Sequence, residues 1–563
     1  MRTGLLVGLA LVAVVLGGAF AGVLGFVVLG NLTSAPLLSQ TRPEMQTPTT
    51  PLEHLLVVDG SSYTGALILT LQSIQAVVNT VRPNNTGLYI IFDPQDQFWL
   101  QQVYVQREGI HITYFPTSND PVEDLATLVD LFRPFFQGLV LFRAEDRLFY
   151  PAVINFAAAY GPALVVPVEH YGRLIHDPEF WQLKNFASTA NQSTIEGIRR
   201  VYDQQVMTLG DKLSGLAVWD LSQDLHNLDF ILAQHYWVWP AQFLTNSSFA
   251  GQQEFARREA STAANKPLVG SWPANLSRLP VPSFPDLGSI PNLSVHQSPW
   301  GAEERFNSST GLPPLTIPPF QGTFPDLDDH PAATIYYAVV VTFESFEQPW
   351  YATLPELLQN NPNLFTGVSL GVQDSLLPLF PALLQWYTEE NIVGSLTPQL
   401  RWVGNVFEPL YYPSLVSSRS VWVGGLPTDS DTSALDSLER WDSTSYREFL
   451  PPSLGSFWVP TGLSGRSSFF GRPLLTHQFD VELWEEANGS YIELANLVES
   501  NYLLGPNSSR YLLIEVPYDP QTLLGYLTLL NSVLDYLGGF KSWPTHRVSP
   551  DALAELMTQE GSM

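Results

Sequence analysis

The stretch that most constrains the fold is residues 334–413, where three strand-helix units follow one another. It opens with an unbroken apolar run, Ile335–Val341, which is rich in β-branched and aromatic residues and long enough for one buried strand. Shorter strands are predicted from Gly367 and from Leu400. Acidic residues follow each strand closely: Glu344 and Glu347 after the first, Asp374 after the second and Glu408 after the third. This alternation predicts a parallel sheet or (β/α) barrel, in which chemistry gathers where the strands end.

The same alternation begins near residue 54 and predicts a Rossmann-like α/β domain over residues 54–172. No GxGxxG turn follows its first strand, Leu55–Val58, so we interpret this domain as a scaffold and not as a dinucleotide site. A helical bridge is predicted over residues 173–213. About eight further strand candidates predict a barrel-like domain over residues 214–563, with a proline-rich insertion at 273–330.

The N-terminus predicts a membrane anchor. Residues 4–30 carry no charged side chain, and as a helix they would span roughly 40 Å, more than the hydrocarbon core of a bilayer. Arg2 on the short side predicts a cytoplasmic N-terminus and an extracellular bulk. We therefore expect a single-pass transmembrane signal anchor over 1–32, followed by a Thr/Pro-rich stalk over 33–53. Cleavage as a signal peptide after Ala19-Phe20-Ala21 is the alternative.

Composition excludes several classes of function. The net charge of −28 argues against binding nucleic acid, and the absence of cysteine excludes disulfides and thiolate metal sites. No metal and no cofactor is predicted. Asn-x-Ser/Thr sequons are more frequent than chance predicts, which supports export and glycosylation. They begin at Asn31, Asn84, Asn191, Asn246, Asn275, Asn292, Asn307, Asn488 and Asn507.

Several short segments, taken in order, resemble a known family. They are Leu71-Gln72 with Val78-Asn79, Leu88-Tyr89 with Asp93, Trp99-Leu100, Gly270-Ser-Trp272, Asn292-Leu-Ser-Val295, Ala338–Gln348 and Leu383–Asn391. Together they resemble the GxGYxYP family, whose members are classed with the glycoside hydrolases. The name-giving motif is represented here by Phe407–Pro413, which keeps only the closing Tyr-Pro. The resemblance implies an N-terminal α/β domain, a barrel-like domain and a role with carbohydrate, and it transfers no catalytic residue.

Glycoside hydrolysis needs two carboxylates, one on either side of the sugar bond. Strand ends can supply that pair, and the candidates are Glu344 and Glu408, followed by Asp374 and Glu347. The alternative is that these acids cap the helices that follow them. Aromatic rings near strand ends could stack on sugar faces, although such rings are more often core. These candidates are Trp272, Trp402, Trp458 and Tyr412.

Two functions remain open at this point. The first is a membrane-anchored, glycosylated cell-surface protein whose hydrolase-like domain binds or hydrolyses carbohydrate. The second is a non-catalytic surface-layer or filament-like protein, built on a decayed hydrolase scaffold and able to associate with itself at the cell surface. The two predict different things at the strand ends: an open pair of carboxylates for the enzyme, and a filled edge for the structural protein.

Overall fold

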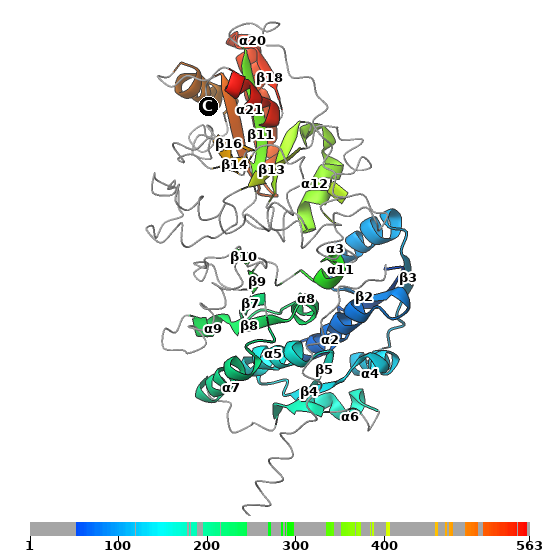
Figure 1. Cartoon of the computed structure of the whole chain (residues 1–563). Helices are drawn as coiled ribbons and strands as arrows, with labels where there is room; N and C mark the ends of the chain where they lie inside the picture. Colours follow the sequence, from blue (N-terminus) through cyan, green and yellow to red (C-terminus); the bar gives the residue numbers. More distant parts are fainter. Residues whose placement is uncertain are drawn as a thin grey trace, which may run out of the picture. The chain divides into compact units, whose positions relative to one another are not determined.

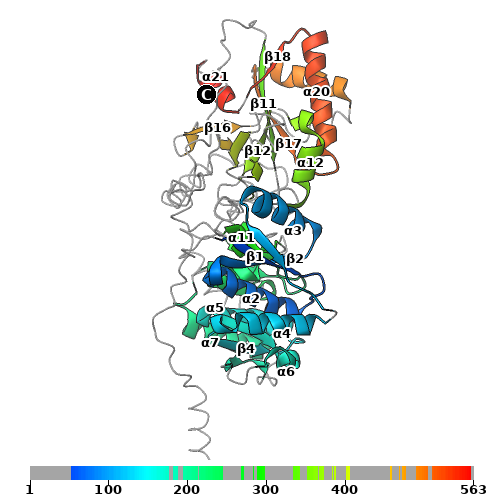
Figure 2. The same cartoon turned by 90° about the vertical axis from the view of Figure 1, so that its right-hand side faces the viewer.

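Parallel sheets with helices between them make up the computed structural model of this chain (Figures 1 and 2). The predicted α/β class is therefore confirmed. The structure describes residues 52–118, 120–176, 180, 182–187, 195–213, 215–244, 268–271, 283–284, 288, 290–297, 334–342, 351–365, 367–372, 383, 386–387, 401–405, 457–459, 468–469, 472–476, 490–504, 510–548 and 550–559.

The first part of the chain forms two separate three-stranded parallel sheets, with strand orders β2-β1-β3 and β5-β4-β6. Their strands are β1 (His54–Asp59), β2 (Thr86–Ile91), β3 (His111–Tyr114), β4 (Gly138–Phe142), β5 (Ala163–Pro167) and β6 (Gln182–Asn185). A single Rossmann-type sheet would place all of these strands in one order. No described ladder joins the two sheets. The described strands therefore do not form the single sheet that a Rossmann-like domain would have.

Helix α2 (Ala66–Val81) explains the division. Its sequence is apolar around most of its circumference, and 13 of its 16 residues are buried. A helix of this kind needs protein on all sides, and α2 contacts β2, β5 and the helices α4 (Pro121–Phe132) and α8 (Leu228–Ala233). Its Ser73 Oγ accepts a hydrogen bond from Val165 N–H of β5 at 3.1 Å. The helix therefore lies against edge strands of both sheets, β2 in one and β5 in the other.

Two asparagine amides complete the free edge of β2. Asn79 of α2 donates through Nδ2 to Leu88 O at 3.1 Å and accepts through Oδ1 from Leu88 N–H at 2.7 Å. Asn292, just before α11 (Leu293–Gln297), makes the same pair of bonds with Ile90, both at 2.7 Å. Each amide thus supplies the donor and acceptor of a missing neighbouring strand. The edge is buried and satisfied without a fourth strand.

A third sheet also has an edge strand that is completed by an asparagine amide. Its order is β10-β9-β7-β8, and its strands are β7 (Gly215–Trp219), β8 (Tyr236–Pro240), β9 (Leu268–Ser271) and β10 (Ser283–Phe284). On its edge strand β8, Val238 donates to Asn155 Oδ1 at 2.6 Å and accepts from Asn155 Nδ2 at 3.1 Å. Asn155 belongs to α5 (Tyr150–Tyr160). Other helices around these sheets are α3 (Pro94–Trp99), α6 (Tyr171–Leu174), α7 (Ile195–Leu209) and α9 (Ala241–Leu244).

The C-terminal part contains an eight-stranded sheet in which β11 pairs with β12, β17 and β18. Its order is β15-β16-β14-β13-β12-β11-β17, and β18 also pairs with β11. All ladders are parallel except that of β15 with β16. The strands are β11 (Ile335–Thr342), β12 (Val368–Val372), β13 (Arg401–Asn405), β14 (Phe457–Val459), β15 (Ser468–Phe469), β16 (Arg472–Thr476), β17 (Tyr511–Pro517) and β18 (Thr545–Arg547).

Helices cover both faces of this sheet at β11 (Figure 2). Tyr336, Ala338 and Val340 pack with α21 (Pro550–Gln559). The opposite face of β11 belongs to the same core as α12 (Leu354–Asn360), α19 (Tyr491–Val498) and α20 (Leu523–Phe540). A closed (β/α) barrel fills its inner face with side chains and not with a helix. Among the described strands no ladder joins β17 to β15, so this region fits a sheet covered on two faces better than the predicted closed barrel.

Within the described residues, no helix is both long enough and apolar enough to cross a membrane. The predicted anchor over 1–32 and nearly all of the predicted stalk over 33–53 lie outside the described residues. The domain boundaries at 172/173 and 213/214, and the insertion at 273–330, stay predictions.

We expect Asn155→Ala to lower the free energy of unfolding by about 2–6 kcal/mol, because it leaves the N–H and C=O of Val238 buried and unpaired. Asn496→Ala, at an exposed position of α19, is the matched control and should change stability by less than about 0.5 kcal/mol. Urea unfolding of both variants measures the difference. Equal stabilities would contradict the edge-completing role of Asn155.

Candidate active site

The three strands that precede the predicted catalytic acids lie side by side. β11 pairs with β12 and β12 with β13, all parallel, with Val341 opposite Leu370 and Leu370 opposite Trp402. Their carboxyl ends therefore meet at one edge of the sheet, and β11 and β13 are about 10 Å apart because neighbouring strands are about 4.8 Å apart. The candidates themselves, Glu344, Glu347, Asp374 and Glu408, lie outside the described residues.

The aromatic candidates fall at different levels of this sheet. Trp402 is the second residue of β13, so its backbone lies near the amino end of the strand and not at the predicted carboxyl end. Trp458 pairs with Asn405, the last residue of β13, and so lies level with the carboxyl edge. Trp272 and Tyr412 lie outside the described residues.

Aspartates at two other strand ends form turns with the backbone that follows. Asp59, the last residue of β1, accepts from Ser61 N–H at 3.0 Å and from Ser61 Oγ at 2.6 Å. Asp220, directly after β7, makes the same two bonds with Ser222, at 3.0 and 2.7 Å. The short aspartate side chain reaches the backbone two residues on, as in an Asx-turn. These two aspartates form turns and do not cap the helices α2 and α8 that follow them, and the capping alternative for the predicted acids stays a prediction.

An Asp-Pro-Gln sequence forms similar bonds after two strands in different sheets. Asp93 follows β2 and accepts from Gln95 N–H at 2.8 Å and Asp96 N–H at 3.1 Å, which caps α3. Asp519 follows β17 and accepts from Gln521 N–H at 2.8 Å, just before α20. Both carboxylates are used to start the next helix or turn.

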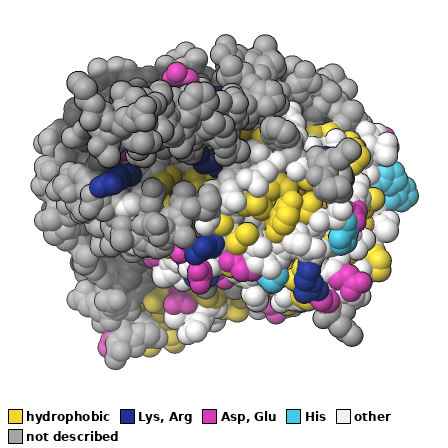
Figure 3. Space-filling view, turned by 90° about the horizontal axis from the view of Figure 1, so that it is seen from below, with side chains coloured by type: hydrophobic (Ala, Val, Ile, Leu, Met, Phe, Trp, Pro, Cys, Tyr) yellow, Lys and Arg dark blue, Asp and Glu magenta, His cyan; other side chains and the backbone are white. Residues whose placement is uncertain are grey.

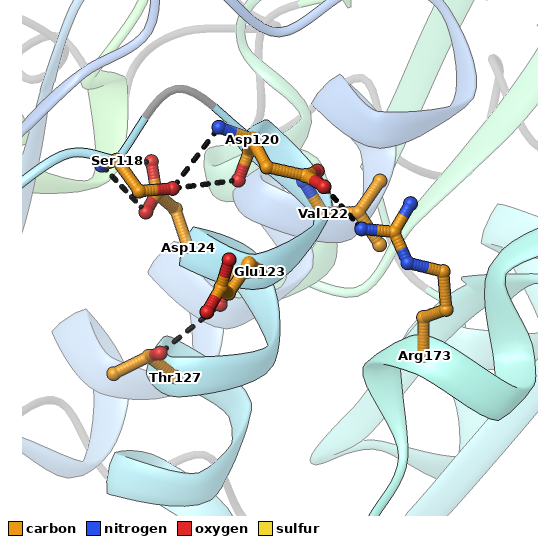
Figure 4. A network of polar contacts seen from close by, with 7 residues as sticks. All are labelled: Ser118, Asp120, Val122, Glu123, Asp124, Thr127 and Arg173. Carbon is orange, nitrogen blue, oxygen red and sulfur yellow. Dashed lines mark hydrogen bonds and ion pairs between the residues drawn. The ribbon is translucent and has the colours of Figure 1, made fainter.

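The start of α4 shows how such a cap can also join two helices (Figure 4). Asp120 accepts from Val122 N–H at 3.0 Å and pairs with Arg173 of α6. The hydrogen bond from Arg173 lowers the pKa of Asp120. Asp124 accepts from Ser118 N–H at 2.8 and 3.0 Å, so both acids hold the backbone that leads into α4.

Sequence reasoning missed one side chain at the edge of the eight-stranded sheet. Tyr518 follows β17, whose last residue, Pro517, pairs with Thr342 at the end of β11. Its hydroxyl is hydrogen-bonded to Thr353 Oγ1, and burial raises its pKa to about 12. Tyr518 is therefore a neutral hydroxyl beside the carboxyl end of β11. A search for polar side chains directly after β17, like the one that selected Glu344 after β11, would have found it.

A buried carboxyl group ties the chain after β11 to α3. Asp96 accepts from Phe92 N–H at 2.7 Å, from Asp93 N–H at 3.1 Å and from the Tyr351 hydroxyl. Trp99 Nε1 donates to Tyr351 O at 2.8 Å. Burial raises the pKa of Asp96 to about 7. Asp96 is fully buried, so we assign it a packing role and not a catalytic one.

Residues that carry the family resemblance contact one another in the core. Asn79 Nδ2 donates to Ser294 Oγ at 2.8 Å, and Tyr89 donates to Asp96 O at 2.9 Å. Gly270 of β9 has φ 142°, and a Cβ there would lie 1.8 Å from Val218 O of β7, so only glycine fits. These motif residues fix strand edges and packing. They are evidence about the fold and not about a reaction.

Two of the predicted glycosylation sites lie in the described residues, and they differ. Asn84 is exposed. Asn292 is 0% exposed and its amide is bonded to Ile90, so the structure contradicts it as a glycan acceptor, because a sugar would need that nitrogen at the surface. The other seven, Asn31, Asn191, Asn246, Asn275, Asn307, Asn488 and Asn507, lie outside the described residues.

For protein purified from a host that glycosylates sequons, we expect a glycan at Asn84 and none at Asn292, because only the first side chain is accessible. Enzymatic release of the glycans in heavy-oxygen water marks each occupied asparagine, and peptide mass spectrometry then reads the marks. A marked Asn292 would show that the packing around α11 is wrong.

We expect the stabilising contribution of Asp96 to fall as the pH rises from 4 to 8, whereas buried His296, whose pKa is lowered to about 3, contributes in the opposite direction below about pH 6.5. The pKa of Asp96 in the fold, about 7, exceeds its ordinary value of 3.8, so the fold favours the protonated acid. Its contribution is fully present below about pH 4 and is lost as the pH rises through about 7, a change of about 4 kcal/mol.

Urea unfolding at several pH values should show this loss, and Asp96→Asn should reduce the slope. Asp535→Asn, an exposed acid on α20, is the control and should leave the slope unchanged. A parent slope that Asp96→Asn does not alter would rule out Asp96 as its source.

Comparison with known proteins finds no matching family model and no matching curated protein. A solved structure that is similar is the 1.25 Å crystal structure of "a putative hydrolase" from Bacteroides thetaiotaomicron VPI-5482. The similarity has a TM-score of 0.58 and 14% sequence identity, and it covers 90% of this chain and 95% of that chain. At this identity the similarity concerns the fold alone. The chain therefore shares its overall fold with a protein described as "a putative hydrolase".

Proposed function

We propose that this protein is an exported, membrane-anchored hydrolase of carbohydrate and a divergent member of the GxGYxYP family. The proposed site is the carboxyl edge of β11, β12 and β13. The observation that carries the proposal is that these three strands are adjacent and parallel, and each is followed within three residues by an acid. Such an edge is where parallel α/β folds place their ligands.

Among these acids, the glutamates are better catalytic candidates than the aspartate. In the described residues the strand-end aspartates cap the segments that follow them, and Asp374 has the same type and spacing. Glutamate is not among the preferred capping residues. Glu169, two residues after β5, accepts from Ala144 N–H after β4 at 3.2 and 3.3 Å and so reaches a neighbouring segment. We take Glu344 and Glu408, the glutamates that follow β11 and β13, as the proposed pair, with Glu347 behind them.

The strand spacing suits two carboxylates that act on one sugar bond. Glu344 and Glu408 leave strands about 10 Å apart, and glutamate side chains can close part of that gap. Retaining glycosidases hold their carboxyl groups about 5–5.5 Å apart and inverting enzymes about 6.5–9.5 Å apart. One glutamate would protonate the leaving oxygen, and the other would attack the sugar or activate water.

The charge of the chain favours neutral glycans as substrates. A net charge of −28 repels polyanions such as nucleic acids and acidic polysaccharides. On the face seen in Figure 3, the described Lys and Arg side chains are scattered and do not form a basic patch. Among the described residues, Arg147 pairs with Asp224 and Arg173 pairs with Asp120.

The non-catalytic surface protein remains the second candidate. It is favoured by the finding that the described motif residues serve edge completion and packing. A scaffold can keep such residues after its chemistry is lost, since they stabilise the fold and not a transition state.

We expect the full-length chain to release sugar from neutral polysaccharides, and Glu344→Gln and Glu408→Gln each to lower the rate by at least about a hundredfold. Glu356→Gln, an exposed acid on α12, is the matched control and should keep the parent rate. Reducing-end release and glycan binding are measured together. Parent rates in both edge variants would remove the site assignment, and a parent that neither binds nor releases sugar would favour the structural protein.

A further inference from the structure

Strand β3 is an edge of its sheet that the chain leaves open. The order β2-β1-β3 puts β2 and β3 at the two ends of this sheet. Asn79 and Asn292 complete the outer side of β2. Among the described residues no strand pairs with the outer side of β3, and the side chains of His111, Thr113 and Tyr114 are exposed. The two ends of this sheet are therefore finished in different ways.

The backbone groups on the outer side of β3 follow from its ladder with β1. His111 N–H and Phe115 N–H donate to carbonyl groups at β1, at 3.1 and 2.8 Å. Successive residues of a strand face opposite sides, so the N–H and C=O groups of Ile112 and Tyr114 point away from β1. These groups are two donors and two acceptors that a further strand could use.

The side chains of β3 do not protect this edge. Exposed edge strands in soluble proteins commonly carry a charged side chain, most often lysine, which prevents pairing with another chain. Edge strand β6 of the β5-β4-β6 sheet follows this rule, because Lys184 lies within it and is exposed. β3 has no lysine, arginine, aspartate or glutamate, and its Tyr114 is 53% exposed. An open, uncharged edge of this kind fits a second strand.

We propose that β3 pairs with β3 of a second copy of this chain, antiparallel and about a two-fold axis at Thr113. Ile112 of each copy then exchanges both backbone hydrogen bonds with Tyr114 of the other copy, so every outward group of β3 is paired. The pairing would join the two sheets in the order β2-β1-β3-β3-β1-β2. A two-fold axis closes the contact, so the product is a dimer.

The sequence around β3 favours this register over its neighbours. Centring the pair on Ile112 would set Tyr114 opposite Ile110, whose N–H already donates to Tyr104 O at 2.8 Å. Centring it on Tyr114 would set Ile112 opposite Pro116, which has no N–H. In the proposed register Ile112 lies opposite Tyr114, and an aromatic ring against a β-branched side chain is a favourable cross-strand pair.

The contact covers apolar surface but is small. Ile112 packs at the margin of the main hydrophobic core, and the exposed Tyr114 ring of the second copy would lie beside it. Stable interfaces bury about 1,200–2,000 Å², of which a four-residue strand supplies only a part. The net charge of −28 on each copy also opposes association. We therefore expect a weak dimer that high salt favours. This inference goes beyond the proposed hydrolysis and does not depend on it.

Disulfide trapping in the full-length chain tests the register, because the parent has no cysteine. Thr113 lies opposite itself in a non-hydrogen-bonded pair, where Cα atoms are about 4.5 Å apart and a disulfide can form. In high salt and mild oxidant, we expect Thr113→Cys to form dimers at least about ten times faster than His111→Cys.

His111→Cys is the matched control. His111 is exposed on the same strand and the same face as Thr113. In the proposed register its two copies are four residues apart along the strands, about 13 Å, which is too far for a disulfide. Equal rates of dimer formation in the two variants would overturn the proposal.

Tyr114→Pro, added to Thr113→Cys, tests whether the backbone makes the contact. It removes an outward N–H that β1 does not use, and proline is tolerated at such edge positions. We expect cross-linking to fall to the rate of His111→Cys while the circular dichroism stays that of the parent. A rate that the proline does not change would contradict pairing through β3.

Hydrogen exchange of the parent gives a test that needs no substitution and decides if a variant does not fold. The outward amides of Ile112 and Tyr114 should exchange more slowly as the protein concentration rises. The Thr113 amide faces β1, so its exchange should change little. Outward amides whose exchange does not depend on concentration would overturn the proposal.

Discussion

The fold depends on how it completes the edges of its small sheets. Asn79, Asn292 and Asn155 each present one amide to one strand residue, and each amide gives that residue both of the hydrogen bonds that a further strand would give. A short sheet can then end inside the protein, where an unpaired edge would otherwise be costly. The separation of β1–β6 into two sheets, with α2 between their edge strands, follows from this.

Short polar side chains also pair with backbone groups at the ends of strands. Aspartates after β1, β2, β7 and β17 turn back onto the next backbone N–H groups and start the following turn or helix. In the described residues, these aspartates at strand ends therefore have a structural role. Glutamate is not a preferred capping residue, and its longer side chain reaches further: Glu169 after β5 accepts from Ala144 N–H after β4. This distinction by side-chain length separates Glu344 and Glu408 from Asp374 in the proposed site.

Buried polar groups concentrate where the first part of the chain is joined together. Asp96 links α3 to the segment after β11, and hydrogen bonds of Gln72, Gln75 and Asp229 link α2, α8 and α11 to one another. In both places a carboxyl group is held away from water, and its pKa rises for that reason. Packing in these regions is thus coupled to pH.

The sequence by itself determined the α/β class, the positions of most strands and the order of the motif segments, because strand and helix periods are local properties. It also determined that three strand ends are acidic. Only the tertiary structure decided that β11, β12 and β13 are neighbours, that Asn292 is buried and not a glycan site, and that α2 divides two sheets. Those facts depend on contacts between residues such as Asn79 and Ser294, which are 215 positions apart and leave no local pattern.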